Sequence, residues 1–423
     1  MAPSHAPRAL RAGSFCVHTW DDPTLRPVNE TPLAGLRVLE LGAFIAGPFA
    51  GQLLGDLGAE VIKVEPPGIG DIMRRYGVRV DGKSLWWPAI ARNKRSVAID
   101  LRDARGREAA RRIAARCDIV LENFKPGTLA GWGLDYATLA GDNPGVVLVH
   151  VSGFGQTGPR TAEPGFGSIG EAMGGIRHTT GDPDRPPART GVSIGDSLAG
   201  LFAVVGALAA LNERSRSGRG QEVDVAIYEA VMALMESTVA DYEIAGVTRT
   251  RSGGILRDVA PANAYPTVDG RDVVIAGNAD AVFARLCDAM GRPDLARDLA
   301  SHEARAERQD PLDREIAAWT ATMTADDLIA LLRAHDVPAG LINRAADLAT
   351  DPHIAAREMI VRLAAGFAAD VPMTGVVPRF SRTPGEIRSV GPALGADTDA
   401  VLRELAGYSD EELAGLRDGG VVA

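Results

Sequence analysis

The sequence predicts an α/β protein, with a Rossmann-like open parallel sheet in a large domain and a smaller α+β second domain. Strand-like apolar segments alternate with helical segments in the first part of the chain, and the residue pattern changes after about position 245. A chain of 423 residues that is 46% hydrophobic can also fill more than one core. We expect residues 32–240 and 346–423 to form the large domain and residues 245–345 the small one.

The first predicted unit is a strand, a helix and a second strand. Residues 38–41 read as a strand that Gly42 ends, residues 47–57 have helical apolar spacing, and residues 61–64 read as the next strand. This order implies a right-handed crossover between parallel strands. The pattern continues with strands at 96–99, 118–121 and 146–151 and a helix at 105–116.

Open parallel sheets bind ligands beyond the carboxyl ends of their strands. The loops after Leu41, Val64 and Leu121 are therefore where we expect a site.

The next segments predict tight packing and then a second domain. Residues 197–213 are nearly all apolar and small, which predicts a buried helix against the sheet. A glycine-rich hinge at 217–220 precedes a strand at 222–227 and a long apolar helix through about Thr238. The small α+β domain is expected from the segments 273–276, 283–290 and 316–332.

Composition limits the partners. The net charge of −10 argues against nucleic acid, and three widely spaced cysteines suggest neither a zinc site nor a disulfide framework. No run of about 18 apolar residues occurs, and the first residues lack the apolar segment of a secretory signal. We expect a cytoplasmic protein without a membrane partner. Residues 1–31 lack periodicity and are predicted to be a disordered extension.

Asp184 is the predicted catalytic residue. It lies on the short, proline-stiffened loop at residues 181–187, and a carboxylate held in this way can attack an activated acyl group. The alternative is that Asp-Pro-Asp serves only as turn chemistry. Arg177, Arg185 and Arg189 flank the loop and would pair with a second carboxylate on a substrate.

Further motifs follow one another along the chain. They lie at residues 33–41, 46–48, 55–66, 92–96, 121–127, 152–159 and 407–413. In this order and spacing they resemble the family III CoA-transferases, the group that contains formyl-CoA transferase and the carnitine CoA-transferase. The resemblance covers about residues 32–415. It implies an enzyme that moves CoA from an acyl-CoA thioester to a free carboxylic acid through an aspartyl-CoA thioester. It implies no metal and no permanently bound cofactor, because the CoA thioester is a substrate.

The basic triplet Arg92, Lys94 and Arg95 is predicted to hold the phosphates of CoA. Arginine makes bidentate contacts to phosphate and lysine a point contact. The alternative is a solvated run of charge.

The resemblance also implies where the rest of CoA lies. Ile45 and Ala46 match positions whose backbone lies beside the nucleotide, and the alternative for them is ordinary strand-to-helix turn chemistry. The loop of Asn123, Phe124 and Lys125 would run along the CoA.

A second group of residues is predicted to shape the reacting end of the site. Gln156 is a candidate donor to a developing oxyanion. Gly253 and Gly254 match a glycine loop that closes over the reacting aspartate in family members, the alternative being a plain interdomain linker. Asp196 is interpreted as a cap of the helix that follows it.

Two other functions compete with CoA transfer. The related α-methylacyl-CoA racemases pair a His with an Asp; this chain has Phe166 at the place of the His and Asp196 at the place of the Asp. The other alternative is a non-catalytic CoA-binding protein, against which the presence of Asp184 argues.

The resemblance further implies an interlocked homodimer, and the arginines near Asp184 favour C4–C5 dicarboxylates as substrates. Two departures from the family pattern stand out. Gly395–Thr398 lacks the histidine of a Gly-Glu-His-Thr motif, Asp397 standing in its place, and Gly167 replaces an Asp of some subfamilies. We expect Gly167 to affect the shape of the substrate site.

Overall fold

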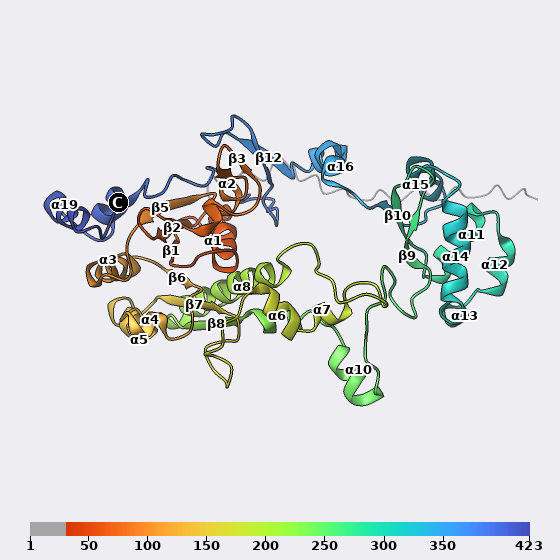
Figure 1. Cartoon of the computed structure of the whole chain (residues 1–423), viewed down its shortest axis with the longest axis horizontal. Helices are drawn as coiled ribbons and strands as arrows, with labels where there is room; N and C mark the ends of the chain where they lie inside the picture. The colour runs from red at the N-terminus through yellow and green to blue at the C-terminus, as the bar shows by residue number, and fades with distance from the viewer. Residues whose placement is uncertain (1–30) are drawn as a thin grey trace, which may run out of the picture.

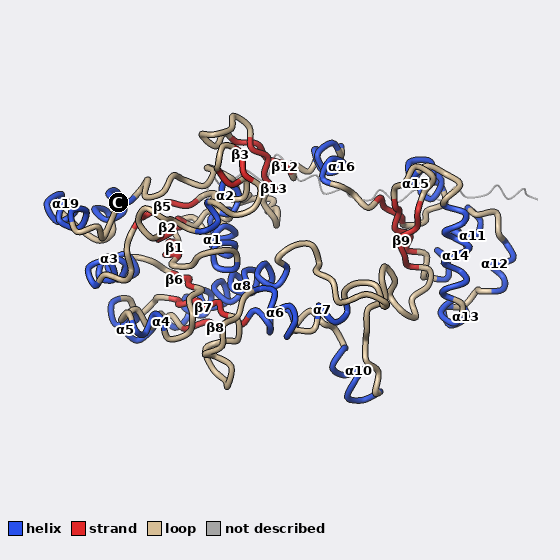
Figure 2. Tube along the Cα trace, in the orientation of Figure 1, coloured by secondary structure: helices blue, strands red, loops and turns tan. Residues whose placement is uncertain are grey.

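A computed structural model describes residues 31–423 as two bodies at opposite ends of an elongated molecule (Figure 1). The expected extension at residues 1–31 lies almost wholly outside these described residues. Two long stretches connect the bodies, and Figure 2 shows that much of their length is loop. The predicted fold class, a parallel α/β sheet with a second α+β body, is confirmed.

The large body is built on one six-stranded parallel sheet of order β5-β2-β1-β6-β7-β8. Its strands are β1 (Arg37–Glu40), β2 (Glu60–Glu65), β5 (Lys94–Ala98), β6 (Ile119–Glu122), β7 (Val147–Ser152) and β8 (Glu222–Ala226). Every strand that the apolar runs predicted is present, because buried parallel strands read as short continuous apolar segments.

Helices cover both faces of this sheet. The helices of this body are α1 (Ala46–Asp56), α2 (Trp87–Ile90), α3 (Ala104–Ala114), α4 (Thr128–Gly131), α5 (Tyr136–Asp142), α6 (Gly167–Met173), α7 (Ile176–Thr179), α8 (Ile194–Ser217), α9 (Ile227–Met232), α18 (Thr398–Glu404) and α19 (Asp410–Asp418). A further helix, α10 (Thr238–Ala245), stands away from the sheet and buries none of its residues (Figure 1). Successive side chains of a strand point to opposite faces of the sheet, so neighbouring residues pack against different helices. Val38 packs with α1 and α8, whereas the adjacent Leu39 packs with α3 and the C-terminal helices.

Short elements at residues 72–84 lie beside the sheet. They are a 3-10 helix η1 (Ile72–Arg74) and a hairpin of β3 (Arg79–Val80) and β4 (Lys83–Ser84).

The small body has its own core of buried apolar residues. It contains the antiparallel strands β9 (Ala262–Pro266), β10 (Asp272–Ala276) and β11 (Ala339–Leu341) and the helices α11 (Asp280–Ala289), α12 (Pro293–Asp298), α13 (His302–Glu307), α14 (Gln309–Thr320) and α15 (Ala325–Ala334). The chain then returns through α16 (Ala345–Thr350), α17 (Pro352–Ala356), β12 (Ile360–Leu363) and β13 (Val371–Thr374).

The return reaches the outer strand β5. Ser96 and Asp397 exchange two hydrogen bonds, from Ser96 N to Asp397 Oδ2 at 2.9 Å and from Asp397 N to Ser96 O at 2.9 Å. Asp397, one of the departures from the family pattern, therefore fastens the C-terminal segment to the sheet.

One predicted helix is wrong in length. The apolar run up to Thr238 does not form one helix: α9 ends at Met232 and α10 begins at Thr238. Glu236, between them, adopts a left-handed φ of 52°, which a continuous right-handed helix excludes.

The helix α8 is the one helix in residues 31–423 that is long and apolar enough to cross a membrane by length and composition. It packs against α1, α9, β7 and β8, as a core helix does. The small residues along it explain how: a Cβ at Gly200 would lie 2.9 Å from Ala46 O. The backbones of α8 and α1 therefore come into direct contact.

Candidate active site

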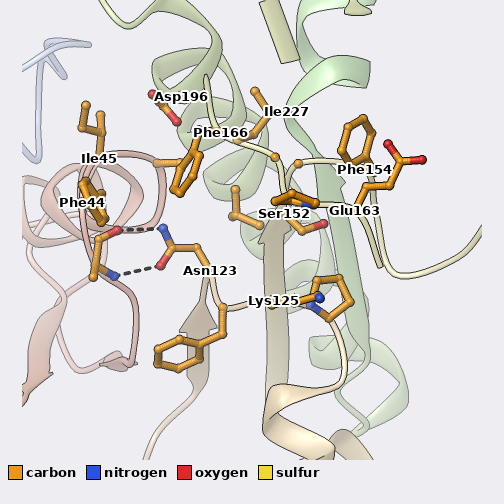
Figure 3. A pocket seen from close by; sticks show the side chains of 18 of the residues that line it. Phe44, Ile45, Asn123, Lys125, Ser152, Phe154, Glu163, Phe166, Asp196 and Ile227 are labelled. Carbon is orange, nitrogen blue, oxygen red and sulfur yellow. Dashed lines mark hydrogen bonds between the residues drawn. The ribbon is translucent and has the colours of Figure 1, made fainter. Parts of the chain in front are cut away.

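A cavity of about 340 Å³ opens at the carboxyl ends of β1, β6 and β7 (Figure 3). Its walls are the loops that follow these strands, together with the start of α6 and the start of α8. Ile45, Ala46, Asn123, Phe124 and Lys125 all line it. The expected loops after Leu41 and Leu121 line this cavity, as the rule for parallel sheets predicts, whereas the expected loop after Val64 does not line it.

Asn123 joins two of these loops. Its side chain accepts a hydrogen bond from Ala43 N at 2.8 Å and donates one to Ala43 O at 2.7 Å, as drawn in Figure 3. A Cβ at Gly42 would lie 2.5 Å from Asn123 Oδ1, so only glycine permits this approach. Asn123 therefore acts on the protein backbone, and the cavity wall that it fixes includes Ile45 and Ala46.

The same loop contains a residue in an unfavourable conformation. Phe44 has a left-handed φ of 66°, and its ring is 43% exposed in the cavity wall. Lys63 Nζ donates to Gly42 O at 2.8 Å, and Phe44 N donates to Asp71 Oδ1 at 3.3 Å. Hydrogen bonds on both sides thus hold the strained residue in place.

Lys94 is not available to a phosphate, contrary to the prediction. It is buried, and its Nζ lies 2.7 Å from Glu40 Oε2 and 2.7 Å from Pro48 O. Burial lowers its pKa to about 8, against the charge of Glu40. Lys94 belongs to a buried ion cluster with Glu40, Lys63 and Asp71 beneath the cavity loop.

The prediction also fails for Arg92. Its side chain is 2% exposed and makes a paired contact with Asp56, from Nε to Oδ1 at 2.9 Å and from Nη2 to Oδ2 at 2.6 Å. Its Nη1 donates to Thr374 O at 2.6 Å. Arg92 therefore ties α1 to the returning C-terminal segment.

Arg95 lies at the outer edge of the sheet and does not line the cavity. It is partly exposed and pairs with Glu60 at 2.7 Å and Glu404 at 3.1 Å. Successive residues of a strand point to opposite faces of the sheet, so Lys94 and Arg95 point in opposite directions. Each of them meets carboxylates there, Glu40 for Lys94 and Glu60 and Glu404 for Arg95. Lys94 and Arg95, which begin β5, thus enter separate ion pairs, and Arg92, in the turn before the strand, pairs with Asp56.

Asp184 lies on an exposed loop and does not line the cavity. The loop is closed by a hydrogen bond from Ala188 N to Thr180 O at 3.0 Å. Its other acidic residue, Asp182, lies 3.6 Å from Arg185. The structure therefore does not bring Asp184 together with Asn123, Lys125 and the other predicted site residues of the cavity.

The glycine segment contacts the loop of Asp184. Gly253 N donates to Gly181 O at 3.0 Å. Arg251 Nε donates to the carbonyl oxygens of Asp182 and Arg185, at 3.3 and 3.1 Å. Gly254 lies next to Asn263 of the small body. The segment therefore connects the two bodies and lies over the Asp184 loop, outside the cavity.

Gln156 has its backbone N hydrogen-bonded to Asp224 Oδ2 at 2.8 Å. Its Nε2 is buried and has no hydrogen-bond partner among residues 31–423. Gln156 is not part of the cavity wall.

Asp196 is the carboxylate in the wall nearest the start of α8, and the sequence analysis gave it the wrong role. It lies in the first turn of α8, whose N-cap is Ser193, and no side chain caps this helix. A Cβ at Gly167 would lie 2.2 Å from Asp196 Oδ2, so the carboxylate occupies the space that a side chain at position 167 would need. Figure 3 shows Asp196 next to Phe166, across the cavity from Lys125.

The surroundings of Asp196 change its acidity. Burial, followed by the negative charge of Glu171, raises the pKa of Asp196 to about 6, and Arg189 opposes this shift. A raised pKa beside a cavity is typical of reactive carboxylates. The signal in the sequence was a Gly-Asp pair at the start of an apolar helix, which is equally typical of a helix N-terminus.

A pair of histidine and aspartate is absent from the cavity wall within the described residues, where Phe166 stands beside Asp196. His150 is buried in β7 and contacts Glu122 Oε1 at 2.5 Å and Glu222 Oε1 at 3.3 Å. Glu122 in turn accepts a hydrogen bond from Phe124 N at 2.7 Å. His150 thus supports the loop of residues 123–125 from below. No cluster of three or more metal-ligating side chains forms within residues 31–423.

Comparisons with known proteins agree with this geometry. The sequence model of CoA-transferase family III matches residues 33–398. The succinyl-CoA–D-citramalate CoA-transferase of Chloroflexus aurantiacus is 54% identical over 389 residues, which is 91% of this chain and 97% of that protein. The succinate–glutarate CoA-transferase of Agrobacterium fabrum is 36% identical over 388 residues, 90% of this chain and 97% of the relative.

A solved structure shares the fold. The crystal structure of a CAIB/BAIF family protein from Brucella suis superposes with a TM-score of 0.80 and 37% identity, over 89% of this chain and 100% of the other. With the family match over most of the chain, these similarities show that the protein belongs to CoA-transferase family III and is a CoA-transferase that uses CoA thioesters as substrates.

Proposed function

We propose that the enzyme moves CoA from a dicarboxylic acyl-CoA, with succinyl-CoA as the donor, to a free C4–C5 dicarboxylic acid, and that Asp196 is the residue that becomes acylated. The observation that carries this proposal is the position of Asp196, a partly buried carboxylate in the wall of the cavity. The same cavity is lined by residues 45, 46 and 123–125, which the sequence predicted to bind CoA. The sequence-based choice of Asp184 is the competing hypothesis, and the exposed position of that residue speaks against it.

The chemistry needs no group beyond the carboxylate and the two substrates. An oxygen of Asp196 attacks the thioester carbonyl carbon, the C–S bond breaks, and CoA leaves as the thiolate with the electron pair. The thiolate then attacks the Asp196 carbonyl carbon of the mixed anhydride and releases the donor acid as a carboxylate. The acceptor carboxylate attacks the resulting aspartyl thioester, and return of the thiolate to the acceptor acyl group regenerates Asp196.

The acidity of Asp196 suits this role. With a pKa of about 6 the group is ionised at neutral pH, and it is more basic than an ordinary aspartate. A more basic carboxylate is a better nucleophile towards a thioester.

The dicarboxylate preference has two supports. The relatives are named for citramalate, malate, mesaconate and glutarate, all of which carry two carboxyl groups. In this chain, Arg189 has no acidic side-chain partner among residues 31–423, and its charge acts on Asp196. A guanidinium there would receive the second carboxylate of an acid bound at Asp196.

The bound CoA would run along the loops at residues 43–46 and 123–125. Lys125 is exposed and has no ion pair within the described residues, so of the four predicted cations it is the one in the cavity wall that is free to meet a phosphate. We retain Gly253 and Gly254 as a segment that moves towards the cavity when substrate binds.

We further propose a homodimer in which the chains interlock. Leu201, Phe202 and Val205 of α8 and Tyr242 and Ile244 of α10 are large apolar residues exposed on the single chain. A second copy would cover such a surface, and the two bodies of the chain are joined by long connections, as an interlocked pair requires (Figure 1). Light scattering across a wide dilution range tests this: a fully active monomer would contradict it.

We place the enzyme in the cytoplasm, where its buried thiols Cys117 and Cys287 would stay reduced.

The test of the function is a panel of acyl-CoA donors and carboxylic acids with mass analysis of each new CoA ester. We expect succinyl-CoA with four- or five-carbon dicarboxylates to give the highest kcat/KM, and monocarboxylates to fall by at least about tenfold through the lost charge-assisted contact. In parallel, enzyme mixed with succinyl-CoA alone is trapped with hydroxylamine and digested. Modification at Asp196 supports the proposal, and modification at Asp184 rejects it in favour of the competing hypothesis.

A further inference from the structure

A second acidic residue, Glu171, lies directly behind Asp196 and takes no part in the reaction described above. It is completely buried in α6, one helical turn after Gly167. Gly167 faces the Asp196 carboxylate, because a Cβ at this position would overlap with it. Residues four apart lie on the same face of a helix, and Glu171 is four residues after Gly167. Glu171 therefore lies on the face of α6 that contacts the start of α8.

Two hydrogen bonds fix Glu171 there. Its Oε2 accepts a hydrogen bond from Arg177 Nε at 2.8 Å, and its Oε1 lies 3.5 Å from Gly195 N, the residue before Asp196. A Cβ at Gly195 would come within 3.1 Å of Glu171 Cγ. Glycine at 167 leaves the space that the Asp196 carboxylate occupies, and glycine at 195 lets the Glu171 side chain come close to the backbone just before Asp196.

We propose that Glu171 is a positioning residue whose buried negative charge drives Asp196 to accept the acyl group and to hold CoA as a thioester. This inference rests on the proposed role of Asp196 as the acylated residue. Before reaction, two carboxylates share one partly buried region, which destabilises the ionised Asp196. When Asp196 attacks, its negative charge passes through the acyl carbon to the leaving sulfur, and Asp196 becomes part of a neutral anhydride and then of a neutral thioester. The repulsion from Glu171 is thereby relieved.

The other charges around Asp196 do not cancel this effect. Arg177, on α7, is committed to Glu171 itself, and Arg189, on the loop before α8, opposes the shift without overcoming it. The direction of the shift at Asp196 agrees with the geometry. Glu163, the other glutamate near the cavity, is not among the groups that shift the pKa of Asp196. It lies elsewhere in the cavity wall and pairs with Arg160 at 2.8 Å.

The test uses the Glu171→Gln variant of the full-length enzyme, with Glu213→Gln as the matched control. Both variants lose one negative charge; Glu213 is near the far end of the same helix as Asp196, exposed, and paired with Arg216. The measurements are kcat/KM for succinyl-CoA from pH 5 to 8.5 and the fraction of enzyme trapped by hydroxylamine. For Glu171→Gln we expect kcat/KM at pH 8 to fall about tenfold, the trapped fraction to fall, and the acid limb of the profile to move to lower pH. The control should match the wild type in all three.

The acid limb separates this role from a structural one. If Glu171 only fills space, Glu171→Gln will keep the wild-type acid limb whatever its rate, and the proposal fails. Glu171→Asp keeps the charge and serves if the glutamine variant does not fold: its acid limb should stay at the wild-type position, and a shift to lower pH would overturn the proposal. Failure of the proposed function is seen separately, as an adduct at a residue other than Asp196 in the wild-type enzyme.

Discussion

Asp184 and Asp196 lie twelve positions apart, and their surroundings are opposite. Asp184 lies on a proline-stiffened loop and is exposed. Asp196 begins a core helix, contacts Gly167, and has its pKa raised to about 6 by burial and by Glu171. The comparison teaches that a sequence pattern can identify a loop rich in carboxylates, but burial and charge decide which carboxylate can react.

The largest expected effect comes from removing each carboxylate in turn. We expect Asp196→Ala to lower kcat by at least about 10³-fold, as for loss of a covalent nucleophile, with a normal fold by circular dichroism. Asp184→Ala should stay within about threefold of the wild type, because an exposed loop carboxylate outside the cavity makes no contact with the reacting group. Steady-state kinetics with succinyl-CoA measures kcat for both variants. A larger loss of kcat in Asp184→Ala than in Asp196→Ala would restore Asp184 as the catalytic residue.

The same contrast between buried and exposed charge applies to the basic triplet. Arg92→Ala should lower the free energy of unfolding by about 3–5 kcal/mol, because it leaves the buried carboxylate of Asp56 without its partner. Arg95→Ala should lower it by no more than about 1 kcal/mol, since its ion pairs are partly solvated. Urea unfolding measures both, and unchanged stability with a raised KM for the CoA ester in Arg92→Ala would revive the phosphate-binding interpretation.

Gly167→Ala tests how closely Asp196 is held. The added methyl group would need the space of Asp196 Oδ2, so the carboxylate must move, and we expect kcat to fall about 10²-fold as it does when a reacting group is misplaced by about 1 Å. Gly141→Ala is the control, because it also lies in a helix and no atom lies within 4 Å of its added Cβ. Equal activity of the two variants would show that the position of Asp196 is not critical.

The pH profile of the wild-type enzyme should show the pKa of Asp196. The reactive form is the carboxylate, so kcat/KM should be level above pH of about 6 and fall about tenfold per unit below it. An acid limb near pH 4 would instead show that the reacting carboxylate has the pKa of an unperturbed aspartate, which would contradict the assignment of Asp196.

The smallest effect concerns stability. Since the folded-state pKa of Asp196 is raised above its value of 3.8, the native state binds the proton more tightly than the unfolded chain. The contribution of Asp196 to stability therefore increases as pH falls from about 6 towards 4, and it is unfavourable above pH 6. Asp196→Asn should raise the free energy of unfolding by about 1–2 kcal/mol at pH 8, a value discounted for the partial exposure of the group. Urea unfolding at pH 8 and pH 4.5 should show this gain at the higher pH only. An equal gain at both values would rule out the ionisation of Asp196 as its cause.

The sequence predicted the sheet and the edge where the cavity lies, because strand and crossover patterns are local and the carboxyl ends of parallel strands meet. It also predicted correctly that Ile45, Ala46, Asn123, Phe124 and Lys125 share one region. It could not predict the fate of Arg92 and Lys94. Their partners, Asp56 and Glu40, lie 36 and 54 positions earlier, and only the packing of α1 and β1 beside β5 joins them.

By itself, then, the sequence determined the α/β class, the order of the strands along the chain and the family, since each rests on patterns of residue type at short spacing. The tertiary structure alone decided which charged groups are buried, which are paired and which face the cavity. The pKa of Asp196 is raised first by burial and then by the charge of Glu171 on another helix, and the missing side chain of Gly167 leaves the space that the Asp196 carboxylate occupies. A carboxylate is made reactive by the low-dielectric space around it, and that space exists only after distant segments have packed together.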